Sequence, residues 1–202
     1  MFLLRHFHVT YLLLTHGAGS NRNAPLLVAL DHAFSEHQIQ VVRYDLPYRQ
    51  DRAKGPPRPG DAARDREGLR EQIVKFREKH AEQVWMGGHS YGGRQASMLA
   101  AEMPGLIDRL LLLSYPLHPP GKPEQMRTAH FPKLHTPALF VHGWKDPFAT
   151  SEEMKAAISL IPAPVQLLEI EGVGHDLGRN HATVAARIVS CFVKLDISRD
   201  QP

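Results

Sequence analysis

A serine between glycines is the feature of this sequence that most directly indicates chemistry. Ser90 lies in the segment GGHSYGG (residues 87–93), which contains the pattern G-x-S-x-G. The segment follows a run of strand character, residues 83–87, and opens a helical pattern, which is the context that this motif requires. A serine on such a turn has a strained backbone with positive φ that lifts its hydroxyl above the sheet. A plain glycine-rich turn is the alternative, but the strand–turn–helix context favours nucleophilic attack on a carbonyl carbon.

A nucleophilic serine needs a base, and the base needs an acceptor that orients it. His175 follows the apolar run of residues 165–170, and Asp146 follows the apolar run of residues 138–142. The carboxyl ends of parallel strands lie at one edge of a sheet, so these side chains are expected to meet there. Their order along the chain, serine, then acid, then histidine, is the order found in one large class of such sites. The sequence therefore predicts the triad Ser90, His175 and Asp146.

Two other aspartates are poorly placed as partners for His175. Asp176 is adjacent in sequence, so the two side chains cannot readily form the required hydrogen bond. Asp108 precedes a strand and is expected at the opposite edge of the sheet. Arg94, on the first turn after the nucleophile, is expected to form an ion pair rather than to clamp a carboxylate.

An oxyanion hole needs two backbone N–H donors. The first is expected from Tyr91, the residue after the nucleophile. The second is expected from Ala18, in the segment HGAG (residues 16–19) that follows the first strand. Gly17 and His89 flank these donors and are the predicted substrate contacts.

Short apolar runs alternate with helical patterns along the chain. Such alternation predicts an α/β fold with a doubly wound, mostly parallel sheet of about six strands, flanked by helices. The expected strands are residues 9–15, 39–45, 83–87, 110–114, 138–142 and 165–170. Apolar stripes at helix spacing lie between and after them, and Thr150 and Glu153 form an expected capping box ahead of one.

Two long connections, residues 46–61 and 115–136, carry several prolines and are expected to be irregular. Residues 43–70 mix Arg and Lys with Asp and Glu and are expected to form a solvated loop. The second connection is too short for a lid domain, so the site should be open or roofed by these loops. Residues 1–8 leave room for one short strand at most.

The bulk numbers exclude several classes of protein. The chain has 202 residues, a formal charge of +3, and no apolar run long enough to span a bilayer, so we expect a single domain (1–202) and a cytoplasmic location. No nucleic-acid or membrane partner is expected, and a monomer or a homodimer is predicted. Cys191, the only cysteine, is expected to be buried on the last helix. No cofactor or metal is expected, because His6 and His8, although spaced H-x-H, lie at the terminus without nearby carboxylates.

Five segments extend the pattern from a site to a family. They are THGAGS (15–20), GGHSYGGRQAS (87–97), LSYPLHPPGKP (113–123), LFVHGWKDPF (139–148) and EGVGHDL (171–177). With them the chain resembles the α/β-hydrolase superfamily over nearly its whole length. More narrowly, it resembles the small dienelactone-hydrolase-like proteins related to the testis-expressed hydrolase-like protein and to a subunit of the non-specific-lethal chromatin complex.

The resemblance implies the triad already derived but supplies no substrate. The expected function is that of a serine hydrolase, in which Ser90 forms an acyl-enzyme from small soluble esters or thioesters. The alternative is a non-catalytic binding or scaffold module that has kept the fold with a vestigial site. A metal-dependent hydrolase is disfavoured because the histidines lack the spacing of a metal site on a helix.

Overall fold

The expected alternation of strands and helices forms one six-stranded sheet in which every neighbouring pair of strands is parallel. The structure is a computed structural model that describes residues 9–79 and 81–195. The expected strand before residue 9, together with His6 and His8, lies outside the described residues. The elements are β1 Thr10–Thr15, α1 Pro25–Ser35, β2 Ile39–Tyr44, α2 Pro47–Asp51, α3 Asp61–Glu78, β3 Gln83–His89, α4 Tyr91–Glu102, β4 Arg109–Leu113, η1 Phe131–Lys133 (a 3₁₀ turn), β5 Ala138–Gly143, α5 Ser151–Ile158, β6 Val165–Ile170 and α6 His181–Val193.

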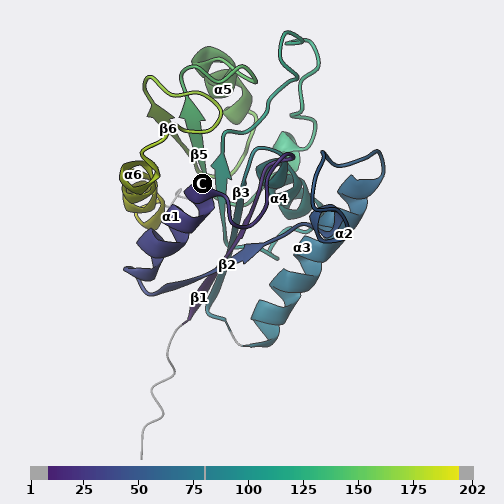
Figure 1. Ribbon diagram of the computed structural model, residues 1–202, viewed down its shortest axis with the longest axis vertical. Helices are drawn as coiled ribbons and strands as arrows, with labels where there is room; N and C mark the ends of the chain where they lie inside the picture. Colours follow the sequence, from purple (N-terminus) through teal and green to yellow (C-terminus); the bar gives the residue numbers. More distant parts are fainter. Residues whose placement is uncertain (1–8, 80, 196–202) are drawn as a thin grey trace, which may run out of the picture.

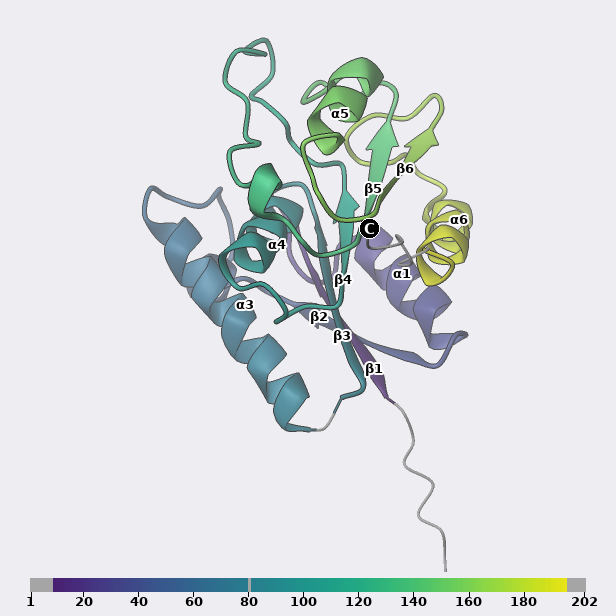
Figure 2. The ribbon, with the colours of Figure 1, turned by 180° about the vertical axis from the view of Figure 1, so that it is seen from behind.

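Helices cover both faces of the sheet. Helices α1 and α6 pack on one face, whereas α3 and α4 pack on the other, as the two opposite views in Figures 1 and 2 show. The strand β4 explains why both faces need cover, because its central leucines alternate between the two cores. Leu110 and Leu112 belong to the core under α3 and α4, and Leu111 and Leu113 belong to the core under α1 and α6. A parallel strand that is apolar on both faces is the pattern predicted from the sequence.

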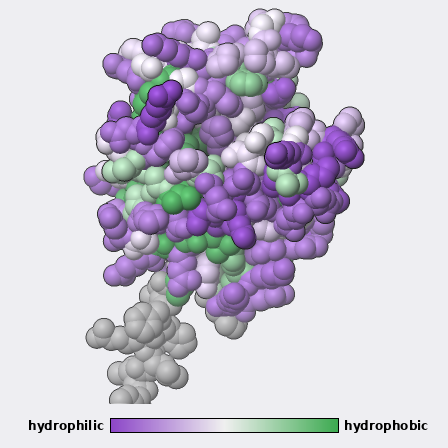
Figure 3. Space-filling view, in the orientation of Figure 1, coloured by the Kyte–Doolittle hydropathy of each residue, from purple (hydrophilic) through white to green (hydrophobic). Residues whose placement is uncertain are grey.

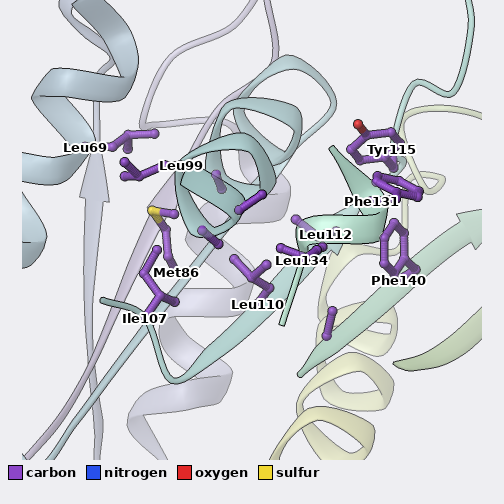
Figure 4. Packing of buried hydrophobic residues seen from close by; sticks show 14 of the residues in the cluster. Leu69, Met86, Leu99, Ile107, Leu110, Leu112, Tyr115, Phe131, Leu134 and Phe140 are labelled. Atoms are coloured by element: carbon purple, nitrogen blue, oxygen red, sulfur yellow. The ribbon is translucent and has the colours of Figure 1, made fainter. Parts of the chain in front are cut away.

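The core beneath α3 and α4 extends to the turn η1. Figure 4 shows leucines of the helices and of β4 packed with Met86 and Ile107, and three aromatic rings at the far end. The rings of Tyr115, Phe131 and Phe140 lie with centroids 5.3–5.9 Å apart. This aromatic cluster anchors the connection after β4 to the sheet.

The strand order β2-β1-β3-β4-β5-β6 determines where a ligand can bind. From β1 the chain moves outward to β2 through α1, and from β3 it moves in the opposite direction through α4 to β4. The carboxyl ends of β1 and β3 therefore flank the point at which the winding reverses. In open α/β sheets, ligands bind at this point. The segment HGAG follows β1 and Ser90 follows β3, so both predicted site elements lie there.

The structure corrects the expectations that residues 46–61 are irregular and that residues 43–70 form a solvated loop. Residues 47–51 form α2 and residues 61–78 form α3, so residues 43–70 are not a solvated loop. Asp65 is fully buried, and Arg49 is 6% exposed. The prediction failed because these charged side chains are satisfied inside the fold by hydrogen bonds, which a count of charges cannot reveal.

The second long connection has the expected character. Between β4 and β5, η1 is the only helical turn among the described residues, so the fold has no lid domain. The ends of the strands agree with the sequence prediction to within two residues, and Thr150 forms the expected capping box with Glu153. Cys191 is half-buried rather than buried and packs beside the core under α6. Across residues 9–79 and 81–195, no helix combines the length and the hydrophobicity needed to cross a membrane.

Candidate active site

Ser90 has the strained conformation that the motif predicts. Its φ is +52° and its ψ is −116°, and its backbone N–H donates to the carbonyl of Leu113 on the neighbouring strand at 2.8 Å. The flanking glycines permit this turn because β1 passes directly behind it. A Cβ atom at Gly92 would lie 2.6 Å from the carbonyl oxygen of His16, and one at Gly88 would lie 2.7 Å from the amide nitrogen of Gly93. These distances leave no room for a side chain, so glycine is required at both positions.

Three predicted residues meet in one hydrogen-bonded chain. The Nε2 atom of His175 lies 2.8 Å from the Oγ atom of Ser90, and its Nδ1 atom lies 2.8 Å from Oδ2 of Asp146. The carboxylate of Asp146 is fully buried, and its Oδ1 atom accepts a hydrogen bond from the N–H of Phe148 at 2.9 Å. With a carboxylate at Nδ1, the neutral imidazole carries its proton there. Nε2 is then free to accept a proton from the serine hydroxyl.

Two other rings pack near the ring of His175. The ring centroid of Phe148 lies 4.3 Å from that of His175, and the centroid of His89 lies at 5.0 Å. The Nε2–H group of His89 donates to the backbone carbonyl of His175 at 2.7 Å. Burial lowers the pKa of His89 to about 4, so its ring is neutral near pH 7. These contacts fix the orientation of the imidazole that faces Ser90.

The two predicted oxyanion donors both lie beside the nucleophile. Gly17 packs against it so closely that a Cβ atom there would lie 3.5 Å from the Cβ of Ser90, and Ala18 is the next residue. Tyr91 is the first residue of α4. Among the described residues, neither the N–H of Ala18 nor that of Tyr91 has a hydrogen-bond acceptor. Both donors are therefore available to a bound oxyanion.

The sequence analysis missed a set of hydrogen bonds, here called the brace, from Tyr48 and Arg49 to residues 16–20, the oxyanion loop. The hydroxyl of Tyr48 donates to the carbonyl of Ala18 at 2.8 Å, and the Nη2 group of Arg49 donates to the same oxygen at 3.1 Å. The Nε group of Arg49 also donates to the carbonyl of Ser20 at 2.7 Å. Both residues of the brace come from α2, which fixes the loop that carries one predicted oxyanion donor.

Asp65 connects this brace to the nucleophile turn. Its Oδ1 atom accepts from the N–H of Tyr48 at 3.0 Å, and its Oδ2 atom accepts from the hydroxyl of Tyr91 at 2.7 Å. Burial raises the pKa of the Asp65 carboxyl and also that of the Tyr91 hydroxyl. One signal in the sequence could have identified this residue. Asp65 precedes Leu69 and Ile73 by four and eight positions, which places an acidic side chain on the buried stripe of α3.

His16 is a second buried polar side chain for which the sequence analysis predicted no role of its own. Its Nδ1–H group donates to the carbonyl of Gly17 at 2.9 Å, and its Nε2 atom accepts from the N–H of Leu46 at 3.2 Å. Burial lowers its pKa, which favours the neutral ring that this pattern requires. His16 therefore ties the oxyanion loop to the chain that enters α2.

The predicted ion pair of Arg94 is wrong. Among the described residues, no carboxylate lies within 4 Å of its guanidinium, and its buried Nε atom has no hydrogen-bond partner. Arg94 lies near Tyr115, Arg127 and His130, and none of these three residues carries a carboxylate. The residues that the structure describes also contain no cluster of three or more His, Cys, Asp or Glu that could hold a metal ion.

Two hollows lie on the side of the sheet covered by α1 and α6. A pocket of about 180 Å³ adjoins the oxyanion loop and is lined by His16, Gly17, Ser20, Ala24, Pro25, Leu26, Leu27, His89, Asp176 and His181. A larger depression of about 640 Å³ lies between α1 and α6, and Figure 3 shows apolar residues gathered on this face. None of the predicted triad, oxyanion or flanking residues lines the larger depression, so the larger volume does not coincide with the predicted site. The smaller pocket contains both predicted substrate contacts, Gly17 and His89.

Comparisons with known proteins identify the family and the fold. Residues 8–188 match the model of a family described as an alpha/beta hydrolase domain. Among solved structures, an alpha-beta serine hydrolase homologue from Coxiella burnetii is 20% identical, with a TM-score of 0.70, covering 91% of this chain and 84% of the other. Est1E from Butyrivibrio proteoclasticus, with ferulic acid bound, is 17% identical with a TM-score of 0.74, covering 92% and 89%. The dienelactone hydrolase from Anabaena variabilis is 17% identical with a TM-score of 0.69, covering 93% and 86%.

Proposed function

The chain belongs to the α/β-hydrolase domain family, and from this premise we propose that it is a serine hydrolase that cleaves small ester or thioester substrates. One observation carries the proposal. The Oγ atom of Ser90, the imidazole of His175 and the carboxylate of Asp146 form a continuous hydrogen-bonded chain with two contacts of 2.8 Å. This chain lies beside two backbone N–H groups that have no acceptor among the described residues. A nucleophile, a base, an orienting acid and an anion site are the parts needed for acyl transfer.

The reaction follows from the positions of these groups. His175 takes the proton of the Ser90 hydroxyl through Nε2 as Oγ attacks the carbonyl carbon of the substrate. The N–H groups of Tyr91 and Ala18 bind the oxyanion that forms. His175 then returns the proton to the leaving alcohol or thiol, which leaves an acyl group on Ser90. Water attacks this acyl-enzyme with the same base, which releases the acid and regenerates the serine.

The shape of the site favours small substrates. No lid domain covers the carboxyl edge of the sheet among the described residues, and the pocket next to the oxyanion loop has a volume of about 180 Å³. A chain of many methylenes would extend from such a site into water and would lose the burial that binds it. Esters and thioesters with short or compact groups are therefore the substrates that we propose.

The proposal is tested by labelling the purified protein with a fluorophosphonate probe and by assaying short p-nitrophenyl esters. The wild-type protein is expected to label and to turn over the shorter esters. Ser90→Ala should abolish labelling, and this variant and His175→Ala should each lower kcat by about 10⁶-fold, whereas Asp146→Asn should lower it by about 10⁴-fold. Matched controls are Ser35→Ala and His32→Ala, which change exposed residues of α1 far from the site. A folded wild-type protein that neither labels nor hydrolyses any ester contradicts the proposal.

A further inference from the structure

The pocket beside His89 has a chemical character of its own. Its walls include Ala24, Pro25, Leu26 and Leu27 from the start of α1, and both leucines are buried. Its other wall is the neutral ring of His89, with Asp176 and His181 among the remaining lining residues. Most of the lining is therefore aliphatic or an uncharged ring. Such a surface binds a compact apolar group by removing it from water.

The position of the pocket relative to His175 decides which part of an ester it can receive. In acyl transfer the protonated base donates its proton to the leaving oxygen, so the leaving group lies on the side of the imidazole. The pocket lies between residues 16–20 and the loop that carries His175. His89 donates to the carbonyl of His175, its ring is 5.0 Å from the imidazole, and Asp176 is the next residue along the chain. Neither Ser90 nor His175 lines the pocket, but their neighbours His89 and Asp176 do, so the group bonded to the leaving oxygen can reach it.

We propose that this pocket is the subsite for the leaving alcohol, and that it selects esters of compact apolar alcohols or phenols. The inference rests on the proposed function, because it assigns one arm of the substrate of that same site. Its volume of about 180 Å³ is close to that of a cavity of about 150 Å³ that holds one benzene molecule. A phenyl group or a short branched alkyl group fits this space, whereas a fused two-ring group does not.

Two series of substrates separate the arms of the ester. In the alcohol series the acyl group is always acetyl, and the alcohol is methanol, phenol or 1-naphthol. Every member forms the same acetyl-enzyme, so differences in kcat/KM report on acylation, in which the alcohol leaves. In the acyl series the leaving group is always p-nitrophenol, and the acid is acetic, butyric or hexanoic. Each variant is compared with the wild type on the same substrate, which cancels the intrinsic reactivity of that ester.

Two variants change the size of the pocket in opposite directions. Ala24→Phe fills it and is expected to lower kcat/KM for phenyl acetate by about 10- to 100-fold while changing methyl acetate by less than about 3-fold. Leu26→Ala enlarges it and is expected to raise the ratio of 1-naphthyl acetate to phenyl acetate by about 10-fold. The controls are Ala29→Phe, which faces the depression between α1 and α6, and Leu30→Ala, which is fully buried on the same helix outside the pocket.

The outcomes distinguish a pocket that holds the alcohol of the ester from one that holds its acid. Changes that depend on the alcohol, are the same for every acid of the acyl series, are opposite in sign for the two variants and are absent from the controls support the proposal. Changes that depend on the acid of the acyl series overturn it, because the pocket would then hold the acid arm. Turnover with unaltered profiles in both series overturns the pocket's role but leaves the hydrolase intact. Failure of the wild type to cleave any ester contradicts the proposed function itself. Circular dichroism shows whether Ala24→Phe folds. If it does not, the ratio of 1-naphthyl acetate to phenyl acetate measured with Leu26→Ala decides whether the pocket holds the alcohol.

Discussion

Removing the carboxylate of Asp65 is expected to weaken both the fold and the reaction, although this residue is not part of the predicted triad. Asp65 is fully buried and accepts two hydrogen bonds, one from the N–H of Tyr48 and one from the hydroxyl of Tyr91. Asp65→Ala leaves both donors buried without an acceptor, and each such loss costs about 1–3 kcal/mol. The change also removes the cost of burying a charge, which offsets part of that loss. We therefore expect the free energy of unfolding to fall by about 2–4 kcal/mol.

The effect on catalysis follows from the same contacts. Asp65 accepts a hydrogen bond from Tyr48, and Tyr48 donates one to the carbonyl of Ala18, so the loss of Asp65 should loosen the loop that carries one predicted oxyanion donor. Complete removal of one such donor costs about 10²- to 10³-fold in kcat. Loosening is a smaller perturbation, so kcat is expected to fall by about 10-fold. KM should change little, because the donor binds the oxyanion of the transition state more strongly than the ground-state carbonyl.

Asp65→Asn is the matched control. Its carbonyl oxygen can still accept from Tyr48, and its amide can donate to the hydroxyl of Tyr91, so both positions stay paired and the loss should stay below about 1 kcal/mol. Urea unfolding at pH 7 and steady-state kinetics with a short p-nitrophenyl ester measure both effects. An Asp65→Ala protein that unfolds at the wild-type urea concentration and keeps its kcat refutes the argument, because the brace would then contribute nothing.

The pH dependence of stability gives an independent check on Asp65. Burial raises the pKa of its carboxyl above the value of about 3.8 in the unfolded chain, so the native state binds more protons in the window above that value. Stability then falls as the pH rises through this window, and this contribution is absent from Asp65→Asn. The wild type is therefore expected to gain stability relative to Asp65→Asn as the pH is lowered toward 4. A difference that does not vary with pH contradicts the cause given for the shift.

Two further predictions concern single positions near the nucleophile. Gly92→Ala should lower the free energy of unfolding by about 1–3 kcal/mol, because the methyl group would lie 2.6 Å from the carbonyl of His16. The control Gly19→Ala, whose methyl group meets no atom within 4 Å, should change it by less than about 0.5 kcal/mol. Thermal unfolding of both variants tests this, and equal losses of stability would contradict it. His89→Phe should lower kcat, because it keeps a ring but loses the hydrogen bond to the carbonyl of His175. Since burial lowers the pKa of His89 from 6.5 to about 4, wild-type stability relative to this variant should decline as the pH falls from 6.5 toward 4, and a flat difference in urea unfolding would be the contrary result.

The sequence predicted the parts of the site that depend on local patterns. Ser90 could be found because its turn requires glycines at fixed offsets, and the steric contacts at Gly88 and Gly92 show why. His175 and Asp146 could be found because parallel strands bring their carboxyl ends to one edge, whatever the loops between them do. Their hydrogen bonds to each other and to Ser90 are those that the triad hypothesis requires. The catalytic role of these residues stays a prediction that the variants test. The likeness to the chromatin-complex subunit and the cytoplasmic location also stay predictions.

The sequence analysis failed where the deciding contacts join distant segments. Arg49 lies in a stretch of mixed charge, and nothing in its neighbours shows that it reaches the carbonyls of Ala18 and Ser20, about thirty positions away. Asp65 lies on an apolar stripe, which is a visible signal, but its partners Tyr48 and Tyr91 lie on two other helices. A polar side chain can be assigned to the interior only when its partners are known. Charge counts therefore placed these residues in solvent.

These buried contacts also explain how an open site without a lid can hold a precise geometry. The segment that carries Ala18 has no regular structure of its own, and the carbonyl of Gly17 already accepts from the ring of His16 and from the N–H of Ser20. In a trans peptide the N–H points away from the carbonyl, so this arrangement directs the N–H of Ala18 to the opposite side of the peptide plane. The donors from α2 fix the next carbonyl along the chain. Two successive peptides are thus oriented before any substrate arrives, and an oxyanion donor that is fixed in advance needs no reorganisation during the reaction. Substitutions in α2 should therefore act on kcat more than on KM, although α2 provides no group that reacts.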